Sequence, residues 1–247
     1  MQQLTIAIVP TLAAPPEGAQ LVIFCDPRGY VAEIDSSMML AAAARYAIRH
    51  KVYLVPERFI AANYLCLCLL SPQGVVIGAQ RAVHLNLSLR EHNYYRDDAI
   101  RPFDTPLGRV ALLVDVDVNM PQVARAAVEA GATLLLSSQF IQLYDLYEDR
   151  VRYGAINAAV SNGVNVAAAA GMGGIIVRCD GRELAGFSEE LPVVAALDPS
   201  RCHADRDAIA AGRRLLTRHR PLLADRPAVE GGAARCISSG SRPRPLQ

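Results

Sequence analysis

Short apolar stretches recur along most of the chain and are separated by turn residues or by longer amphipathic stretches. Apolar runs of this length, rich in valine, isoleucine and leucine, are typical of buried strands. We predict strands at residues 4–9, 20–24, 52–55, 64–70, 75–80, 110–118, 133–136, 164–168, 174–179 and 193–197. The chain is therefore expected to be rich in β-structure.

Helix-type periodicity fills several of the gaps between these strands. The predicted helices are residues 35–50, 121–130, 150–162 and 204–218. The first has Asp35 or Ser36 available as an N-cap, because a side-chain oxygen there can accept a bond from the first turn. The second begins with Pro121 and stops at Gly131, where a left-handed backbone costs little. Strands and helices therefore alternate.

The order of these elements predicts the architecture. Turn signals at residues 71–74, 104–108 and 179–181 indicate hairpins, whereas residues 109–136 read as a strand, a helix and a second strand. Hairpins mixed with such crossovers favour an α/β fold: a four-layer α-β-β-α sandwich of two mixed sheets with helices on the outer faces. We expect one domain over residues 1–226, followed by a disordered tail at 227–247, which is rich in Gly, Ser, Pro and Arg.

Composition narrows the functional classes. A chain of 247 residues with 52% hydrophobic residues can bury a large single core. The formal net charge of +1 provides no broad field for nucleic acid or an anionic membrane, so neither is an expected partner. The N-terminus lacks a basic region and its apolar run is too short to span a bilayer, so we expect a cytoplasmic protein. The glycine-rich segment at 171–174 leads into a strand and not into a helix, so we interpret it as a turn and not as a phosphate-binding loop. No cofactor is expected.

The cysteines and the lysine count restrict the possible chemistry. Six cysteines are scattered without the spacing of a zinc site, which favours buried free thiols. Cys66 and Cys68 would lie on one face of a strand, and a metal role for them is the less favoured alternative. Lys51 is the only lysine of the chain. Any site that requires an ammonium group therefore has one candidate.

Two aspartates mark the strand at 110–118 as a candidate site. Alternation in Val-Asp-Val-Asp-Val predicts that Asp115 and Asp117 share one strand face, just before the proline-started helix. Ligands of open α/β sheets bind beyond the carboxyl ends of the strands, where these residues lie. An ordinary polar strand face is the alternative interpretation.

Several segments occur in the order found in a known family. They are LVIFCDPRGY at 21–30, QRAVHL at 80–85, GRVALLVDVDVNMPQVAR at 108–125 followed by GATLLL, and AAVSNGVNVAAAAG at 158–171. Together they resemble the nitrilase or carbon-nitrogen hydrolase superfamily over roughly residues 3–227. The resemblance implies a cysteine nucleophile, a glutamate base and a lysine that stabilises the oxyanion.

This chain differs from the family at each of these three positions. Asp26 stands at the position of the glutamate, Ala82 at that of the lysine and Asp115 at that of the cysteine, while a second family glutamate corresponds to Glu91. A thiolate and a fixed cation each contribute orders of magnitude to such reactions, so we expect no ordinary hydrolysis. By strand alternation Cys25 and Arg81 should point away from the pocket, and Lys51 should lie at the opposite end of the sheet.

The altered pocket is predicted to be acidic, because it would gather Asp26, Asp115, Asp117 and Glu91. Carboxylates this close require either a retained proton or a cation. The cation could be Mg²⁺, Ca²⁺, or an ammonium or guanidinium ligand. The alternative is that nearby arginines pair with the acids. His84 and His92 are interpreted as ordinary polar residues in preference to ligands.

The favoured hypothesis is a non-catalytic member of the fold that binds a small ligand, a cation or a partner. The alternative is a hydrolase of amide- or nitrile-type C–N bonds that works without cysteine. The resemblance also implies a homodimer, with the helix at 121–130 as the candidate contact face.

Overall fold

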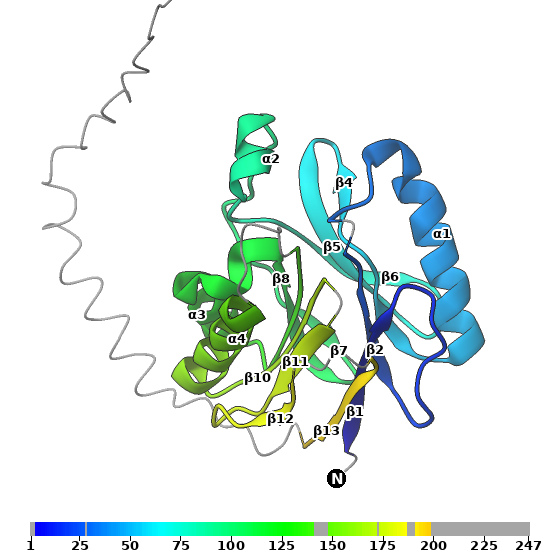
Figure 1. Ribbon diagram of the computed structural model, residues 1–247, viewed down its shortest axis with the longest axis vertical. Helices are drawn as coiled ribbons and strands as arrows, with labels where there is room; N and C mark the ends of the chain where they lie inside the picture. The colour runs from blue at the N-terminus through cyan, green and yellow to red at the C-terminus, as the bar shows by residue number, and fades with distance from the viewer. Residues whose placement is uncertain (1–2, 28, 141–147, 172, 187–190, 199–247) are drawn as a thin grey trace, which may run out of the picture. The chain divides into compact units, whose positions relative to one another are not determined.

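The structure is a computed structural model, and it describes residues 3–27, 29–140, 148–171, 173–186 and 191–198. All of these belong to a unit spanning Met1–Asp205, and a second unit, Arg206–Gln247, contains none of them. The predicted helix at 204–218 and the predicted tail at 227–247 lie outside the described residues. Figure 1 shows the elements in chain order.

Sheet A has seven strands, and its central ones are parallel. In spatial order they are β13 (Val193–Leu197), β1 (Leu4–Pro10), β2 (Leu21–Cys25), β3 (Tyr53–Val55), β5 (Tyr64–Leu70) and β4 (Phe59–Ala61), with β6 (Val76–Arg81) also paired to β5. The β1–β2 and β2–β3 pairs are parallel, and the remaining pairs are antiparallel. The parallel strands β2 and β3 therefore end at the same edge of the sheet.

Sheet B has six strands and is built in the same way. Its order is β12 (Glu183–Ala185), β11 (Gly173–Val177), β10 (Asn165–Ala170), β9 (Leu134–Gln139), β8 (Gly108–Val114) and β7 (Phe103–Thr105). Strands β8, β9 and β10 are parallel, and hairpins add β7 and the β11–β12 pair at the two edges. The carboxyl ends of β8 and β9 thus lie side by side.

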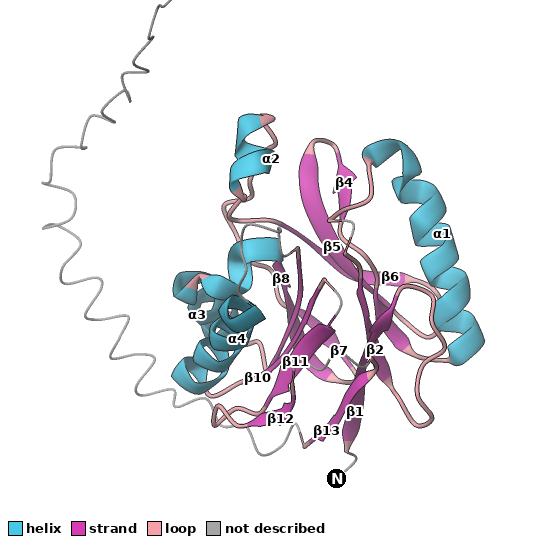
Figure 2. Cartoon of the chain, in the orientation of Figure 1, coloured by secondary structure: helices cyan, strands magenta, loops and turns pink. Residues whose placement is uncertain are grey.

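The helices complete the four layers (Figures 1 and 2). Helix α1 (Glu33–His50) covers the outer face of sheet A, and α3 (Pro121–Glu129) and α4 (Glu148–Asn162) cover that of sheet B. Two short helices lie near the strand ends: α2 (Leu87–Glu91) and a 3-10 helix, η1 (Asp115–Asn119). The predicted α-β-β-α sandwich is confirmed. No described helix combines the length and the apolar character needed to cross a bilayer.

Successive side chains of a strand point to opposite faces of its sheet. In sheet A they form a hydrophobic core on each face. Ile6 and Ile8 of β1 pack between the two sheets, where side chains from sheet B meet them. Ala7 and Val9 of the same strand face α1 and pack with Tyr46. Strands buried on both faces read as continuous apolar runs, which is why the sequence predicts them well.

Two local predictions are wrong. Helix α1 begins at Glu33 with Ala32 as its N-cap and no side-chain cap, and the Ser36 hydroxyl donates to the Glu33 carbonyl. The strand predicted at 110–118 stops at Val114, and the chain continues as η1. The reason lies in the aspartates, which bond to groups outside the sheet, as described below.

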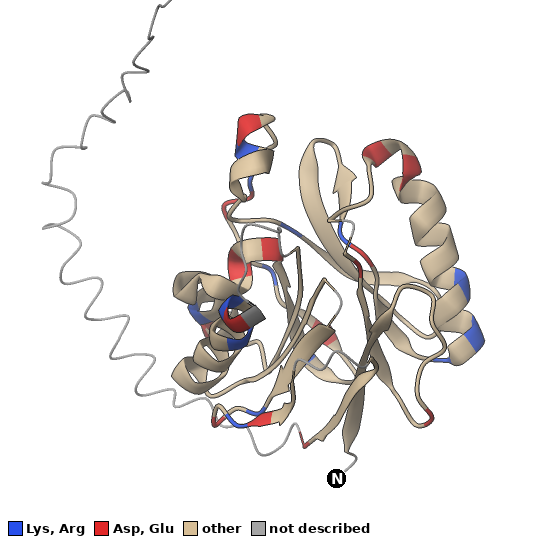
Figure 3. Ribbon diagram, viewed as in Figure 1, with Lys and Arg blue, Asp and Glu red and all other residues tan. Residues whose placement is uncertain are grey.

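Charged residues are concentrated on the helices and connecting segments, and the strands carry few of them (Figure 3). Five charged side chains of the described residues are nevertheless buried: Asp26, Glu57, Arg58, Asp115 and Asp117. Burial of a charge is costly unless it is paired and hydrogen-bonded. These five therefore define where the candidate site must be sought.

Candidate functional site

The buried charged residues come from segments that follow parallel strands. Asp26 follows β2, Glu57 and Arg58 follow β3, and Asp115 follows β8. In α/β sheets this carboxyl edge is where ligand sites form. Three segments far apart in the sequence are thereby brought to one centre.

Arg58 supplies the cation of this centre. Its Nη1 lies 3.4 Å from Oδ1 of Asp115, and both side chains are almost completely inaccessible, at 2% and 1% exposure. Burial lowers the pKa of Arg58, and the negative charges of Asp115, Asp26 and Glu57 oppose this effect. A guanidinium stays protonated in proteins, so Arg58 is a permanent positive charge among three acids.

The carboxylate of Asp115 is fully engaged by the protein. Besides Arg58, the Asn86 Nδ2 group donates to its Oδ2 at 2.9 Å, and the Phe140 backbone N–H donates to its Oδ1 at 2.9 Å. The residue has a left-handed backbone with φ of 52°. This turn directs the side chain toward donors that a continued strand could not reach. Asp115 thus connects the segments that follow β3, β6 and β9.

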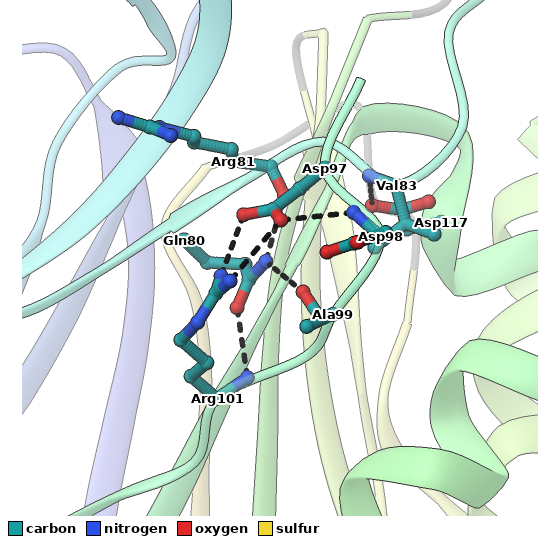
Figure 4. Close-up of polar contacts among 8 residues, drawn as sticks. All are labelled: Gln80, Arg81, Val83, Asp97, Asp98, Ala99, Arg101 and Asp117. Carbon is teal, nitrogen blue, oxygen red and sulfur yellow. Dashed lines mark hydrogen bonds and ion pairs between the residues drawn. The ribbon is translucent and has the colours of Figure 1, made fainter.

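Asp117 has a separate set of partners. The backbone N–H groups of Val83 and His84 donate to its two oxygens at 3.0 and 2.8 Å, and His84 Nδ1 lies 3.0 Å from Oδ1. Figure 4 shows the contact with Val83. Burial raises the pKa of Asp117, and the hydrogen bonds from Val83 and His84 act in the opposite direction. Asp117 therefore fastens the segment after β6 to sheet B.

Ala82 presents only a methyl group to the interior. It is completely buried among apolar residues, its N–H donates to the Leu65 carbonyl at 2.8 Å, and its own carbonyl accepts from Asp97. The neighbouring Arg81 points away from Asp117 (Figure 4), and its guanidinium lies 4.1 Å from the centre of the Tyr64 ring. The predicted orientation of Arg81 is confirmed.

The predicted acidic cluster is not assembled. Glu91 is an exposed residue at the end of α2, and Asp115 and Asp117 sit in η1 with different partners, so they do not share a strand face. Across the described ranges, no group of three His, Cys, Asp or Glu side chains could hold a metal ion. Pairing of an arginine with the acids, the alternative interpretation, is what the structure contains.

Arg58 is the functional residue that sequence reasoning missed. It lies in the segment LVPERFI, between two apolar stretches, and follows Glu57 directly. A charged pair inside an apolar segment is the signal that could have indicated a buried role, since such charges are rarely buried unpaired. Its partner Asp115 is 57 residues away, and only the fold brings the two together.

Three cysteines, Cys25, Cys66 and Cys68, are buried and are poor candidates for a nucleophile. Cys25 is packed between the sheets, as alternation predicts, and its burial raises the pKa of the thiol to about 11. Burial likewise raises the pKa of Cys66 to about 11 and that of Cys68 to about 12. The prediction of buried free thiols is confirmed for these three. Their low acidity keeps the reactive thiolate scarce at neutral pH.

Two cavities lie near the centre. The first, of about 610 Å³, is lined by Asp26 and Glu57 together with apolar residues such as Phe24, Met38 and Met39. The second, of about 870 Å³, lies beside α2 and includes His84 and Met120 in its wall. Both are within the range of small-molecule sites in size.

The fold and this centre define a class: two-sheet α/β sandwich proteins with a polar centre at the carboxyl edge of both sheets. The model of the family described as carbon-nitrogen hydrolase matches residues 17–207. The chain therefore belongs to the carbon-nitrogen hydrolase family. No curated protein matches the chain.

Solved structures show the same fold at low sequence identity. A carbon-nitrogen hydrolase from Helicobacter pylori G27 is 17% identical with a TM-score of 0.68, covering 91% of this chain and 95% of its own. A mutant of an amidase of the nitrilase superfamily from Nesterenkonia AN1 is 19% identical with a TM-score of 0.68, covering 87% and 97%. Nit3 from Saccharomyces cerevisiae, of branch 10 of the superfamily, is 17% identical with a TM-score of 0.65, covering 87% and 94%.

Proposed function

We propose that this chain is a non-hydrolytic member of the carbon-nitrogen hydrolase family, in which the catalytic centre has become a buried ion-pair centre, and that it acts by binding a small ligand. The observation that carries the proposal is the state of Asp115. This residue stands where the family motif has its cysteine, and its carboxylate is held by Arg58, Asn86 and Phe140.

Nucleophilic attack by Asp115 is opposed by these contacts. A carboxylate is a weak nucleophile, and it attacks only when a lone pair of one of its oxygens is directed at the substrate. The Asp115 oxygens instead accept hydrogen bonds, and a guanidinium lies beside them. Their lone pairs are therefore engaged by the protein and are less nucleophilic. In mutants of the Nesterenkonia amidase, by contrast, solved structures show covalent addition of acrylamide, or of the acetamide moiety of fluoroacetamide, at the active-site cysteine.

Arg58 does not replace the missing lysine. An oxyanion hole works when its donors face the position where negative charge develops on the substrate. Arg58 is buried against Asp115 at 2% exposure, and the Ala82 methyl group occupies the lysine position of the motif. A tetrahedral intermediate would therefore develop its charge without a dedicated cation.

A substrate panel tests the proposal. We expect no turnover of short amides, nitriles or carbamoyl compounds above the buffer rate, with the Nesterenkonia amidase as the positive control. Turnover that survives alkylation of the thiols and disappears in Asp115→Ala would instead establish the alternative, a cysteine-independent hydrolase. The homodimer through α3 stays a prediction based on the family resemblance.

A further inference from the structure

The cavity beside α2 is lined by basic and aromatic residues, which the ion-pair centre does not explain. It lies between the start of β5 and the segment that follows α2, and its volume is about 870 Å³. Six of its lining residues are basic or aromatic: Tyr64, His84, Arg90, Tyr94, Tyr95 and Arg96. None of its described lining residues is acidic.

The two arginines of this cavity, Arg90 and Arg96, carry positive charge. Neither Arg90 nor Arg96 forms an ion pair within the part of the chain that the structure describes. The acid closest in sequence to Arg96, Asp97, is bound by Arg101 at 2.6 Å. Guanidinium groups match carboxylate and phosphate oxygens with two parallel hydrogen bonds.

His84 adds a third group that can bond to a ligand. Its Nδ1 is 3.0 Å from Asp117, and its side chain is 40% exposed. Because Nδ1 is engaged there, Nε2 is the ring nitrogen left for a ligand. The same residue that fastens the segment after β6 thus lines the cavity.

The tyrosines give the cavity flat apolar walls. The rings of Tyr64 and Tyr95 are 5.5 Å apart between centroids, and Tyr94 contacts Tyr30 at 6.3 Å. Arg81 covers the Tyr64 ring at 4.1 Å. Aromatic walls favour a planar ligand body, because rings pack in offset or edge-on arrangements.

We propose that this cavity binds a small aromatic anion, with its carboxylate or phosphate group on Arg90 and Arg96 and its ring against the tyrosines. The inference rests on the proposed function as a binding protein and names the site and the chemical class of its ligand. The charge of the walls excludes the ammonium ligand that an acidic pocket would select.

Calorimetric titration of the full chain tests the proposal with four probes: phenyl phosphate, benzoate, inorganic phosphate and phenethylamine. We expect one of the two aromatic anions to bind, and the tighter of them identifies the anionic group. Arg90→Gln and Arg96→Gln should each weaken binding about 10-fold, the loss of one charge-assisted hydrogen-bonded group. Arg45→Gln, an exposed arginine on α1, is the matched control and should leave binding unchanged.

A second variant separates the aromatic wall from the charge. Tyr95→Ala should weaken binding of the aromatic anion several-fold and leave the affinity for inorganic phosphate unchanged. Circular dichroism verifies that each variant is folded. The proposal is overturned if neither aromatic anion binds, if phenethylamine binds equally well, or if the arginine variants behave like Arg45→Gln. These outcomes do not depend on the hydrolysis panel, so failure here leaves the non-hydrolytic proposal intact.

Discussion

A single buried arginine supplies the positive charge that faces Asp115. Moving Arg58 and Asp115 out of water costs free energy, which their mutual attraction and the added hydrogen bonds offset only while both partners are present. Removal of one partner leaves the other charge buried without compensation. The stability of the chain should therefore depend strongly on this pair.

Arg58→Met is predicted to lower the free energy of unfolding by about 3–5 kcal/mol, because the Asp115 carboxylate then lacks its counter-ion. Urea unfolding followed by circular dichroism measures this loss. The control is Arg109→Met, which removes the exposed pair with Asp104 and should cost under about 1 kcal/mol.

The double variant Arg58→Met with Asp115→Asn tests whether the pair is the cause. Asparagine removes the charge and keeps an oxygen that can accept a hydrogen bond, so the double variant should lose less stability than the two single variants summed. Strict additivity would show that Arg58 stabilises the fold by packing alone.

At the level of elements, Gln80 of β6 binds the backbone of the segment between α2 and β7. The Gln80 Nε2 group donates to the Ala99 carbonyl at 2.8 Å, and its Oε1 accepts from the Arg101 N–H at 3.0 Å (Figure 4). The same segment contributes Tyr95 and Arg96 to the anion cavity. Gln80 therefore positions residues that it does not touch.

Gln80→Leu is predicted to cost about 1–3 kcal/mol, because the partly buried backbone groups of Ala99 and Arg101 each lose a hydrogen bond to the Gln80 side chain. Hydrogen exchange should show faster exchange at the Arg101 amide and unchanged exchange at the centre of β8. Equal protection of Arg101 in both proteins would mean that the ion pair of Arg101 with Asp97 holds the segment by itself.

The sequence predicts the long elements and misses several of the short ones for a physical reason. Strands such as β2 and β5 are buried enough that their apolar runs alone define them. Strands β4, β7 and β12 have three residues each, and α2 has five, so their existence depends on tertiary contacts that local pattern does not record.

In the candidate site, too, some residues could be predicted from the sequence and others could not. Motif order predicts Asp26, Ala82 and Asp115 as site positions, and all three are buried in the structure. The alternation of valine and aspartate in 114–118 imitates a strand, and only the donors of Asn86, Phe140 and Val83 explain why the chain turns into η1 instead. Arg58 could not be assigned because its partner is distant in sequence.

At the scale of the whole molecule, the two sheets approach each other closely at Gly174 of β11. A Cβ placed there would lie 2.5 Å from Cδ1 of Ile8 in sheet A and 2.7 Å from the carbonyl oxygen of Ala168. Both distances are shorter than side chains tolerate. The absence of a side chain at Gly174 is thus required for the sheets to pack as they do.

Gly174→Ala is predicted to destabilise the fold by about 1–3 kcal/mol through overpacking. Thermal or urea unfolding measures the effect. Addition of Ile8→Val removes the Cδ1 atom and should recover only part of the loss, because the Ala168 carbonyl cannot rotate away. Full recovery would show that the Ile8 side chain alone limits the distance between the sheets.

The positive charge at the centre belongs to the side chain of Arg58. The Asp115 carboxylate therefore needs no external cation as its partner. Chelators, dialysis or amine-free buffer cannot remove the cation that pairs with Asp115. We therefore expect the midpoint temperature of thermal unfolding to stay the same through such treatments, because the counter-ion of Asp115 is a side chain of the protein.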